Sequence, residues 1–92
     1  MIRSFRNKAL AELWSTGKSS KIDRRLHARI LRQLDVIAAA QGLEDMKIQG
    51  FDFYSLRGFD PTRYTIHVNG PWCITFEFDG EDVGQLDFEQ YH

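Results

Sequence analysis

The second half of the chain alternates between apolar and polar side chains, and this alternation constrains the fold more than any other feature. It is strict in the run 72–78, whose apolar members are Trp72, Ile74, Phe76 and Phe78. A period of two residues is typical of a β-strand with one buried face. Further extended runs are predicted over 51–56, 63–69 and 83–90. The pair Asn69-Gly70 indicates a tight hairpin, which Pro71 is able to lengthen.

The first 40 residues have helical spacing instead. Residues 7–15 predict a short helix that stops at Gly17, and residues 21–40 predict a longer one. The apolar stripe of the longer helix consists of Ile22, Leu26, Ile30, Leu34 and Ile37. Ser20 and Asp23 resemble a capping box at its start. Residues 1–5 alternate and predict a short edge strand.

Helices followed by an antiparallel meander predict an α+β fold, in which two N-terminal helices pack on one face of a mainly antiparallel sheet. The aromatic row of the run 72–78 then faces the helices. The opposite face carries Thr65, His67, Cys73, Thr75 and Glu77. We expect the functional site on this open face.

The size of the chain and its single cysteine limit the class of protein. The chain has 92 residues, which predicts one domain over 1–92. One cysteine excludes an intrachain disulfide. No apolar run approaches the ~20 residues that a membrane-spanning helix needs, and the first residues lack the pattern of a signal peptide. A cytoplasmic protein without a membrane role is therefore expected.

Charged side chains are divided unevenly along the chain. Residues 1–32 hold nine Lys or Arg against two acids, and residues 33–92 hold three against eleven, for a net charge of −1. Arg25, Arg29 and Arg32 lie at helical spacing in the basic part. We expect this stripe to bind RNA phosphates. The alternative is that it is only the solvated side of an amphipathic helix.

The chain ends in Tyr91-His92, directly after the last predicted strand. With this ending it resembles the HigB-type toxins of the RelE superfamily, which belong to type II toxin–antitoxin systems. The resemblance spans the whole chain, and its other motifs are Met1-Ile2-Arg3-Ser4-Phe5, Leu56-Arg57-Gly58 and Tyr64-x-Ile66-x-Val68-Asn69-x-x-Trp72-x-Ile74-x-Phe76.

This resemblance implies a RelE-like fold and an endoribonuclease that cuts mRNA at the ribosomal A site. In such a reaction the 2′-hydroxyl of one nucleotide attacks the adjacent phosphate and leaves a cyclic phosphate and a free 5′-hydroxyl. The substrate brings its own nucleophile, so no metal or cofactor is expected. The implied partners are a cognate helix-turn-helix antitoxin of HigA type, the 70S ribosome and mRNA. Candidates for contacting the antitoxin are Glu81, Asp82, Asp87 and Glu89.

The resemblance also implies roles for individual residues. Tyr91 and His92 fall on the C-terminal functional pair of the family, and an imidazole is able to move protons near neutral pH. Arg57 falls where a basic residue contacts the scissile phosphate. Tyr54 occupies a position often held by histidine, and Gln90 stands where an acidic residue is common.

Two positions depart from the family pattern. Cys73 stands where the family has an arginine that stabilises the transition state, and His67 replaces a second arginine. Loss of one preorganised donor costs roughly 3–4 kcal/mol. We therefore expect a toxin with weakened or lost activity, in which Arg63 is a candidate for a compensating charge.

Other interpretations remain open at this point. The first alternative is a non-catalytic protein that binds its antitoxin or the ribosome without cutting RNA, and the second is an unrelated small RNA-binding domain. A nucleophilic Cys73 beside His67, or a metal site formed by both with His92, is disfavoured because no oxyanion pattern or recurrent ligand spacing accompanies them.

Overall fold

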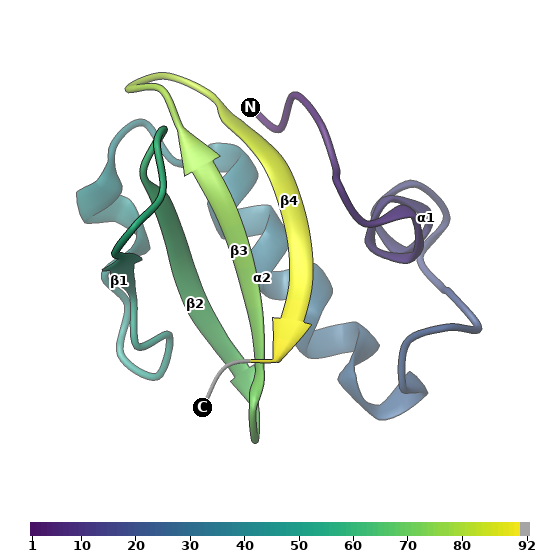
Figure 1. Ribbon diagram of the computed structural model, residues 1–92. Helices are drawn as coiled ribbons and strands as arrows, with labels where there is room; N and C mark the ends of the chain where they lie inside the picture. Colours follow the sequence, from purple (N-terminus) through teal and green to yellow (C-terminus); the bar gives the residue numbers. More distant parts are fainter. Residues whose placement is uncertain (91–92) are drawn as a thin grey trace.

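The computed structural model describes residues 1–90 and has an α+β architecture (Figure 1). Its helical elements are α1 (Lys8–Thr16), η1 (Arg24–Leu26), α2 (His27–Ala39) and η2 (Leu43–Met46). Its strands are β1 (Tyr54–Leu56), β2 (Arg63–Asn69), β3 (Trp72–Phe78) and β4 (Val83–Gln90). The strands form one antiparallel sheet in the order β1-β2-β3-β4. This arrangement confirms the predicted meander and the predicted fold class.

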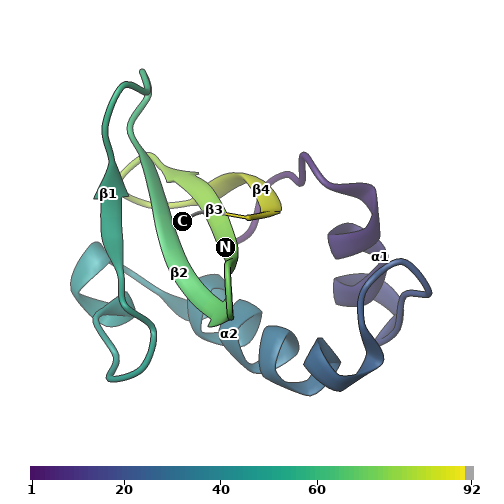
Figure 2. The same cartoon turned by 60° about the horizontal axis from the view of Figure 1, so that its bottom comes forward.

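Helix α2 crosses one face of the sheet, and α1 lies beside β4, where it contacts both α2 and β4 (Figures 1 and 2). The core lies between the helices and the sheet. Fully buried side chains from the helices are Leu10, Leu13, Ile30, Leu34 and Ile37, and those from the strands include Ile66, Ile74, Phe76 and Leu86. Among residues 1–90 no helix covers the other face of the sheet, so that face is free to hold a site.

The N-terminal segment borders the outer edge of β4. Parallel bridges join Ile2 to Val83 and Phe5 to Leu86. The Arg3 amide donates to the Val83 carbonyl oxygen at 2.7 Å, and the guanidinium of the same residue contacts Asp82. The predicted edge strand is therefore present as two isolated bridges. This segment leaves the edge of β4 open beyond Leu86.

The first helix lies within one residue of its predicted bounds and stops at the predicted Gly17, whereas the second starts later than predicted. Asn7 caps α1 by accepting a hydrogen bond from the Leu10 amide, and Gly17 ends it with a φ of +86°. The predicted capping box of Ser20 is wrong. Asp23 is itself the cap, because its carboxylate accepts from the Arg25 amide at 2.9 Å, and it starts the 3-10 turn η1 rather than a helix at residue 21.

The hairpin between β2 and β3 is confirmed, with a turn shifted by one residue. Asn69 pairs with Trp72, so the two loop residues are Gly70 and Pro71, and Gly70 takes the positive φ of +55° that the turn requires. Strand β1 is shorter than predicted, because Asp52 has a φ of +48° and interrupts the extended backbone before Tyr54.

Candidate functional site on the open face of the sheet

The strand register assembles the predicted side chains in adjacent rows on the face away from α2. Directly paired residues of an antiparallel sheet point to the same side. One row contains His67, Cys73 and Glu89, from β2, β3 and β4. The next row contains Tyr54, Thr65, Thr75 and Asp87, one from each strand. The site residues predicted on three separate strands therefore share one surface.

The centre of this face is closed to solvent, and its margins are open. Thr65 and Thr75 are fully buried, and Cys73 is only 7% exposed. Tyr54 is half exposed, and Arg57 is exposed in the turn that follows β1. A large substrate is therefore able to reach Tyr54 and Arg57 directly, whereas Cys73 offers it little accessible surface.

His67 is half-buried and lies next to Cys73. Its Nε2 atom lies 3.0 Å from the Gly70 carbonyl oxygen, which holds the imidazole against the hairpin loop. The Cys73 sulfur lies 3.9 Å from the Pro71 carbonyl oxygen. The side chains of His67 and Cys73 therefore both turn toward the β2–β3 loop.

The predicted residues Tyr91 and His92 lie outside the described part of the chain. The last described residue, Gln90, pairs with Trp72 at the end of the sheet. This pair directly follows the row of Cys73 and Glu89.

Arg63 corrects one expectation from the sequence. Its side chain is only 2% exposed, so it does not present an accessible charge to RNA. Its Nη2 atom donates to the Thr75 hydroxyl at 2.9 Å and to the Gln85 carbonyl oxygen at 2.8 Å. Its Nη1 atom lies 3.5 Å from Glu77. The register places these acceptors around the guanidinium, which is therefore buried against the strands of the sheet.

The three arginines of the predicted basic stripe do not share one helix. Arg25 lies in η1, and its Nη2 atom forms an ion pair with Asp23 at 2.8 Å. Arg29 and Arg32 are exposed on α2 and line a groove of about 350 Å³ together with Ile48 and Phe51. Among residues 1–90, neither Arg29 nor Arg32 forms an ion pair.

The contact between Asp23 and Arg25 predicts how the stability of the fold changes at low pH. Hydrogen bonds from the side chain and the backbone of Arg25 lower the pKa of the Asp23 carboxyl to about 2. A lowered folded pKa contributes stability above the unfolded value near 4, and this contribution is lost as the pH falls toward 2. We expect Asp23→Asn to be less stable at neutral pH but to lose less stability between about pH 4 and 2, as measured by chemical denaturation. Parallel acid profiles for both proteins would contradict this assignment.

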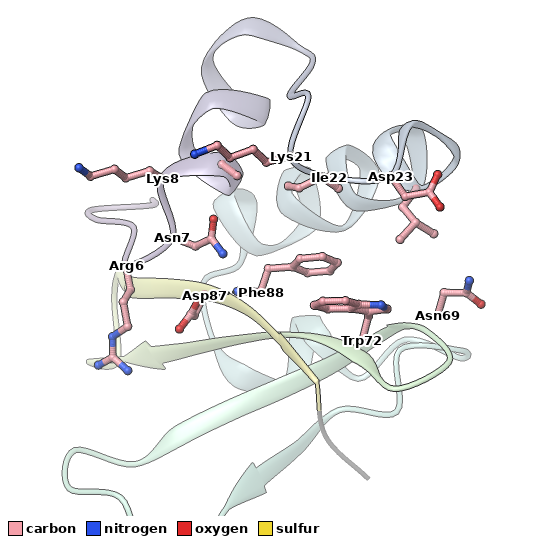
Figure 3. A pocket seen from close by; sticks show the side chains of 12 residues that line it. Arg6, Asn7, Lys8, Lys21, Ile22, Asp23, Asn69, Trp72, Asp87 and Phe88 are labelled. Carbon is pink, nitrogen blue, oxygen red and sulfur yellow. Dashed lines mark hydrogen bonds between the residues drawn. The ribbon is translucent and has the colours of Figure 1, made fainter.

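A separate cleft of about 600 Å³ opens on the helix side of the sheet, between β4, η1 and the start of α1 (Figure 3). Trp72 and Phe88 line it as a stacked pair with ring centroids 4.6 Å apart. The sequence pattern placed Trp72 in the core, and it is indeed packed but half-buried. None of the predicted catalytic residues lines this cleft, so it is distinct from the candidate site.

Sequence reasoning missed Glu89 as a member of the site. Its carboxylate is half-buried on the open face and accepts a hydrogen bond from the Thr75 hydroxyl at 2.5 Å. The alternation of β4 in register with Cys73 was the available signal. Among residues 1–90, no group of three or more potential ligands is placed to hold a metal ion. In the same part of the chain, no helix has the length and apolarity to cross a membrane.

Comparison with known proteins identifies similar chains. A family model described as the RelE-like toxin of type II toxin–antitoxin system HigB matches residues 3–92. An endoribonuclease HigB from Proteus vulgaris is 32% identical over 92 residues, which cover the whole of both chains. An uncharacterized protein from Haemophilus influenzae is 28% identical over 86 residues, covering 89% of this chain and 83% of that protein.

Proposed function

We propose that this chain, which belongs to the HigB-like family of RelE-like toxins, acts as a ribosome-dependent endoribonuclease. The observation that carries this proposal is the similarity to an endoribonuclease HigB along the entire length of both chains. An uncovered sheet face with a basic and a phenolic group at its margin supports it, because such a surface is able to receive an extended strand of RNA.

The proposed reaction needs proton transfer and positive charge but no protein nucleophile. The 2′-oxygen attacks the adjacent phosphorus, and the bond to the 5′-oxygen breaks. His92 gives a proton to the leaving 5′-oxygen, as its imidazole is suited to do near neutral pH. Arg57 binds the scissile phosphate. Tyr91 and Tyr54 contact the substrate by hydrogen bonding or by stacking on a base.

The arginines of η1 and α2 have a separate role in this proposal, which is docking to the ribosome. Arg29 and Arg32 of α2, with Arg25 of η1, contact ribosomal RNA phosphates in this proposal, and His67 lies at the RNA-facing end of the sheet. Phosphate contacts of this kind give affinity that falls with salt and depends little on sequence. Arg63 is not included, because its guanidinium is buried.

Cys73 is the weak point of the proposed active site. The thiol is neutral or, when deprotonated, negative, so it does not stabilise the charge that develops on the phosphate. We therefore propose that activity is reduced relative to a site with an arginine there. The alternative function is binding without cleavage. The observation that favours it is the burial of Cys73, with no accessible cation paired across from it in β2 or β4.

A type II toxin implies a cognate antitoxin. In this proposal the antitoxin has a helix-turn-helix domain of the HigA kind, and the other partners are the 70S ribosome and mRNA in the cytoplasm. Neither a metal nor a cofactor takes part.

Cleavage of mRNA on programmed ribosomes tests the proposed function. We expect the chain to cut ribosome-bound mRNA, to leave free mRNA intact, and to produce fragments with a cyclic phosphate and a 5′-hydroxyl, which labelling of the new ends distinguishes. Addition of the cognate antitoxin is the control and abolishes the cut. Binding to ribosomes without any cleavage, at all protein concentrations, would favour the alternative function.

A further inference from the structure

A network of polar contacts crosses the open face from β2 to β4. It begins at Glu77 and Arg63, which approach to 3.5 Å, and continues from Arg63 to the Thr75 hydroxyl at 2.9 Å. It ends where the same hydroxyl donates to the Glu89 carboxylate at 2.5 Å. The middle of this network is buried, because Arg63 is 2% exposed and Thr75 is fully buried.

The direction of these hydrogen bonds follows from the groups involved. A guanidinium only donates, so the Thr75 oxygen accepts from Arg63. A hydroxyl has one hydrogen, and this hydrogen is therefore available to Glu89 Oε2. Hydrogen bonds in series polarise and strengthen one another at low dielectric. Arg63 and Thr75 thus fix the position of one oxygen of the Glu89 carboxylate.

The other oxygen of Glu89 has no hydrogen-bond partner among residues 1–90. Glu89 is half-buried and shares its row with Cys73 and His67, which are the side chains that face it from β3 and β2. The other charged groups near it on this face are Asp87, which pairs with Thr75 across β3 and β4, and Arg63 and Glu77. A carboxylate held by one oxygen and open at the other is suited to accept a proton in a fixed direction.

We propose that Glu89 is the proton acceptor of the cleavage reaction and that Thr75 and Arg63 are positioning residues for it. This inference rests on the proposed function. The 2′-oxygen forms the new bond to phosphorus while its proton passes to Glu89 Oε1. The bond from phosphorus to the 5′-oxygen breaks, and that oxygen takes the proton of His92. Exchange with water then returns both side chains to their starting states, so protons and electrons balance.

This role differs from that of an acid which only fastens β4 to β3. A structural Glu89 needs an acceptor for the Thr75 hydroxyl, and the amide oxygen of a glutamine also supplies one. A proton acceptor must instead ionise, which glutamine does not do. Substitution of one residue therefore separates the two roles without removing the hydrogen bond to Thr75.

The experiment compares single-turnover cleavage on ribosomes by the unchanged chain, Glu89→Gln and Glu12→Gln, in whichever of the Cys73 and Cys73→Arg backgrounds cuts. Glu12 is the matched control, an exposed acid of α1 that loses the same charge by the same substitution. We expect Glu89→Gln to cut about a hundredfold more slowly, with ribosome binding and thermal unfolding unchanged. Its rate should rise steeply with pH, because hydroxide then replaces the carboxylate, whereas Glu12→Gln keeps the parent rate.

Two variants of Thr75 test the positioning role. Thr75→Val removes the hydroxyl, and we expect it to slow cleavage about tenfold. Thr75→Ser restores the hydroxyl, and we expect it to restore most of the rate and the parent pH profile. Equal rates for Thr75→Val and Thr75→Ser, at equal thermal stability, would overturn the role of Thr75.

The outcomes separate this inference from the proposed function. Cleavage by the parent together with equal cleavage by Glu89→Gln would overturn the role of Glu89 alone. A slower Glu89→Gln whose ribosome binding or unfolding temperature falls in parallel would also overturn it, in favour of a structural role. Absence of cleavage in both backgrounds would overturn the proposed function itself.

Discussion

Cys73→Arg is expected to raise the rate of mRNA cleavage by about a hundred- to a thousandfold, which is the size of effect measured when one preorganised donor to a developing anion is removed. Cys73 lies in the middle of a row, between His67 and Glu89 on the neighbouring strands. A guanidinium in this place is able to bind the phosphate with two parallel hydrogen bonds, which a thiol does not offer.

We expect this substitution to keep the fold. Cys73 is only 7% exposed, but it lies on the face that no helix covers within residues 1–90, so a longer side chain is able to extend past its neighbours toward solvent. Thermal unfolding checks this point. Cys73→Ser is the neutral control, and Cys73→Lys tests charge without bidentate geometry, so we expect cleavage to increase from Ser to Lys to Arg.

Other results of this comparison have definite meanings. Equal cleavage by the unchanged chain and Cys73→Arg would mean that the site functions without that arginine and that Arg57 supplies the charge. Cleavage by Cys73→Arg alone would identify the unchanged chain as a disabled toxin that retains binding. Silence from both would contradict the nuclease and support the non-catalytic binding protein.

The strands were predictable from sequence because their signal is local. Strands β2, β3 and β4 have the predicted bounds of 63–69, 72–78 and 83–90. Each alternates over a stretch long enough to distinguish a period of two from helical spacing. The start of the second helix was not predictable in the same way. Residues around Ser20 and Asp23 offer competing caps, and the structure uses Asp23, directly after the buried Ile22.

The sequence predicted which residues lie on the open face, but not which of them are accessible to solvent. Alternation assigns Thr65, Cys73 and Thr75 to this face, and the structure places them there. Alternation says nothing about the flanking side chains that bury them. Glu89 was missed for a related reason, because its contact with Thr75 depends on the register between β3 and β4, which pairs Cys73 with Glu89 and Thr75 with Asp87.

Arg63→Ala is expected to destabilise the fold by about 3–5 kcal/mol, which is the usual cost of removing one partner from a buried polar network. The substitution leaves the Thr75 hydroxyl and the Gln85 carbonyl oxygen without their buried donor. It also leaves a space in the interior where the guanidinium lay. Urea denaturation of the purified chain, monitored by tryptophan fluorescence, measures this change.

Arg57→Ala is the matched control, because it removes a guanidinium that is exposed in the turn after β1. We expect its free energy of unfolding to stay within about 0.5 kcal/mol of the parent, as is usual for surface positions, while its cleavage of ribosome-bound mRNA decreases. The two arginines therefore separate stability from activity. If Arg63→Ala were as stable as the parent but bound ribosomes less tightly, Arg63 would be an RNA contact after all, and the buried network would have no energetic role. The structure favours the first result because every donor of Arg63 that has a partner points to an atom of the sheet itself.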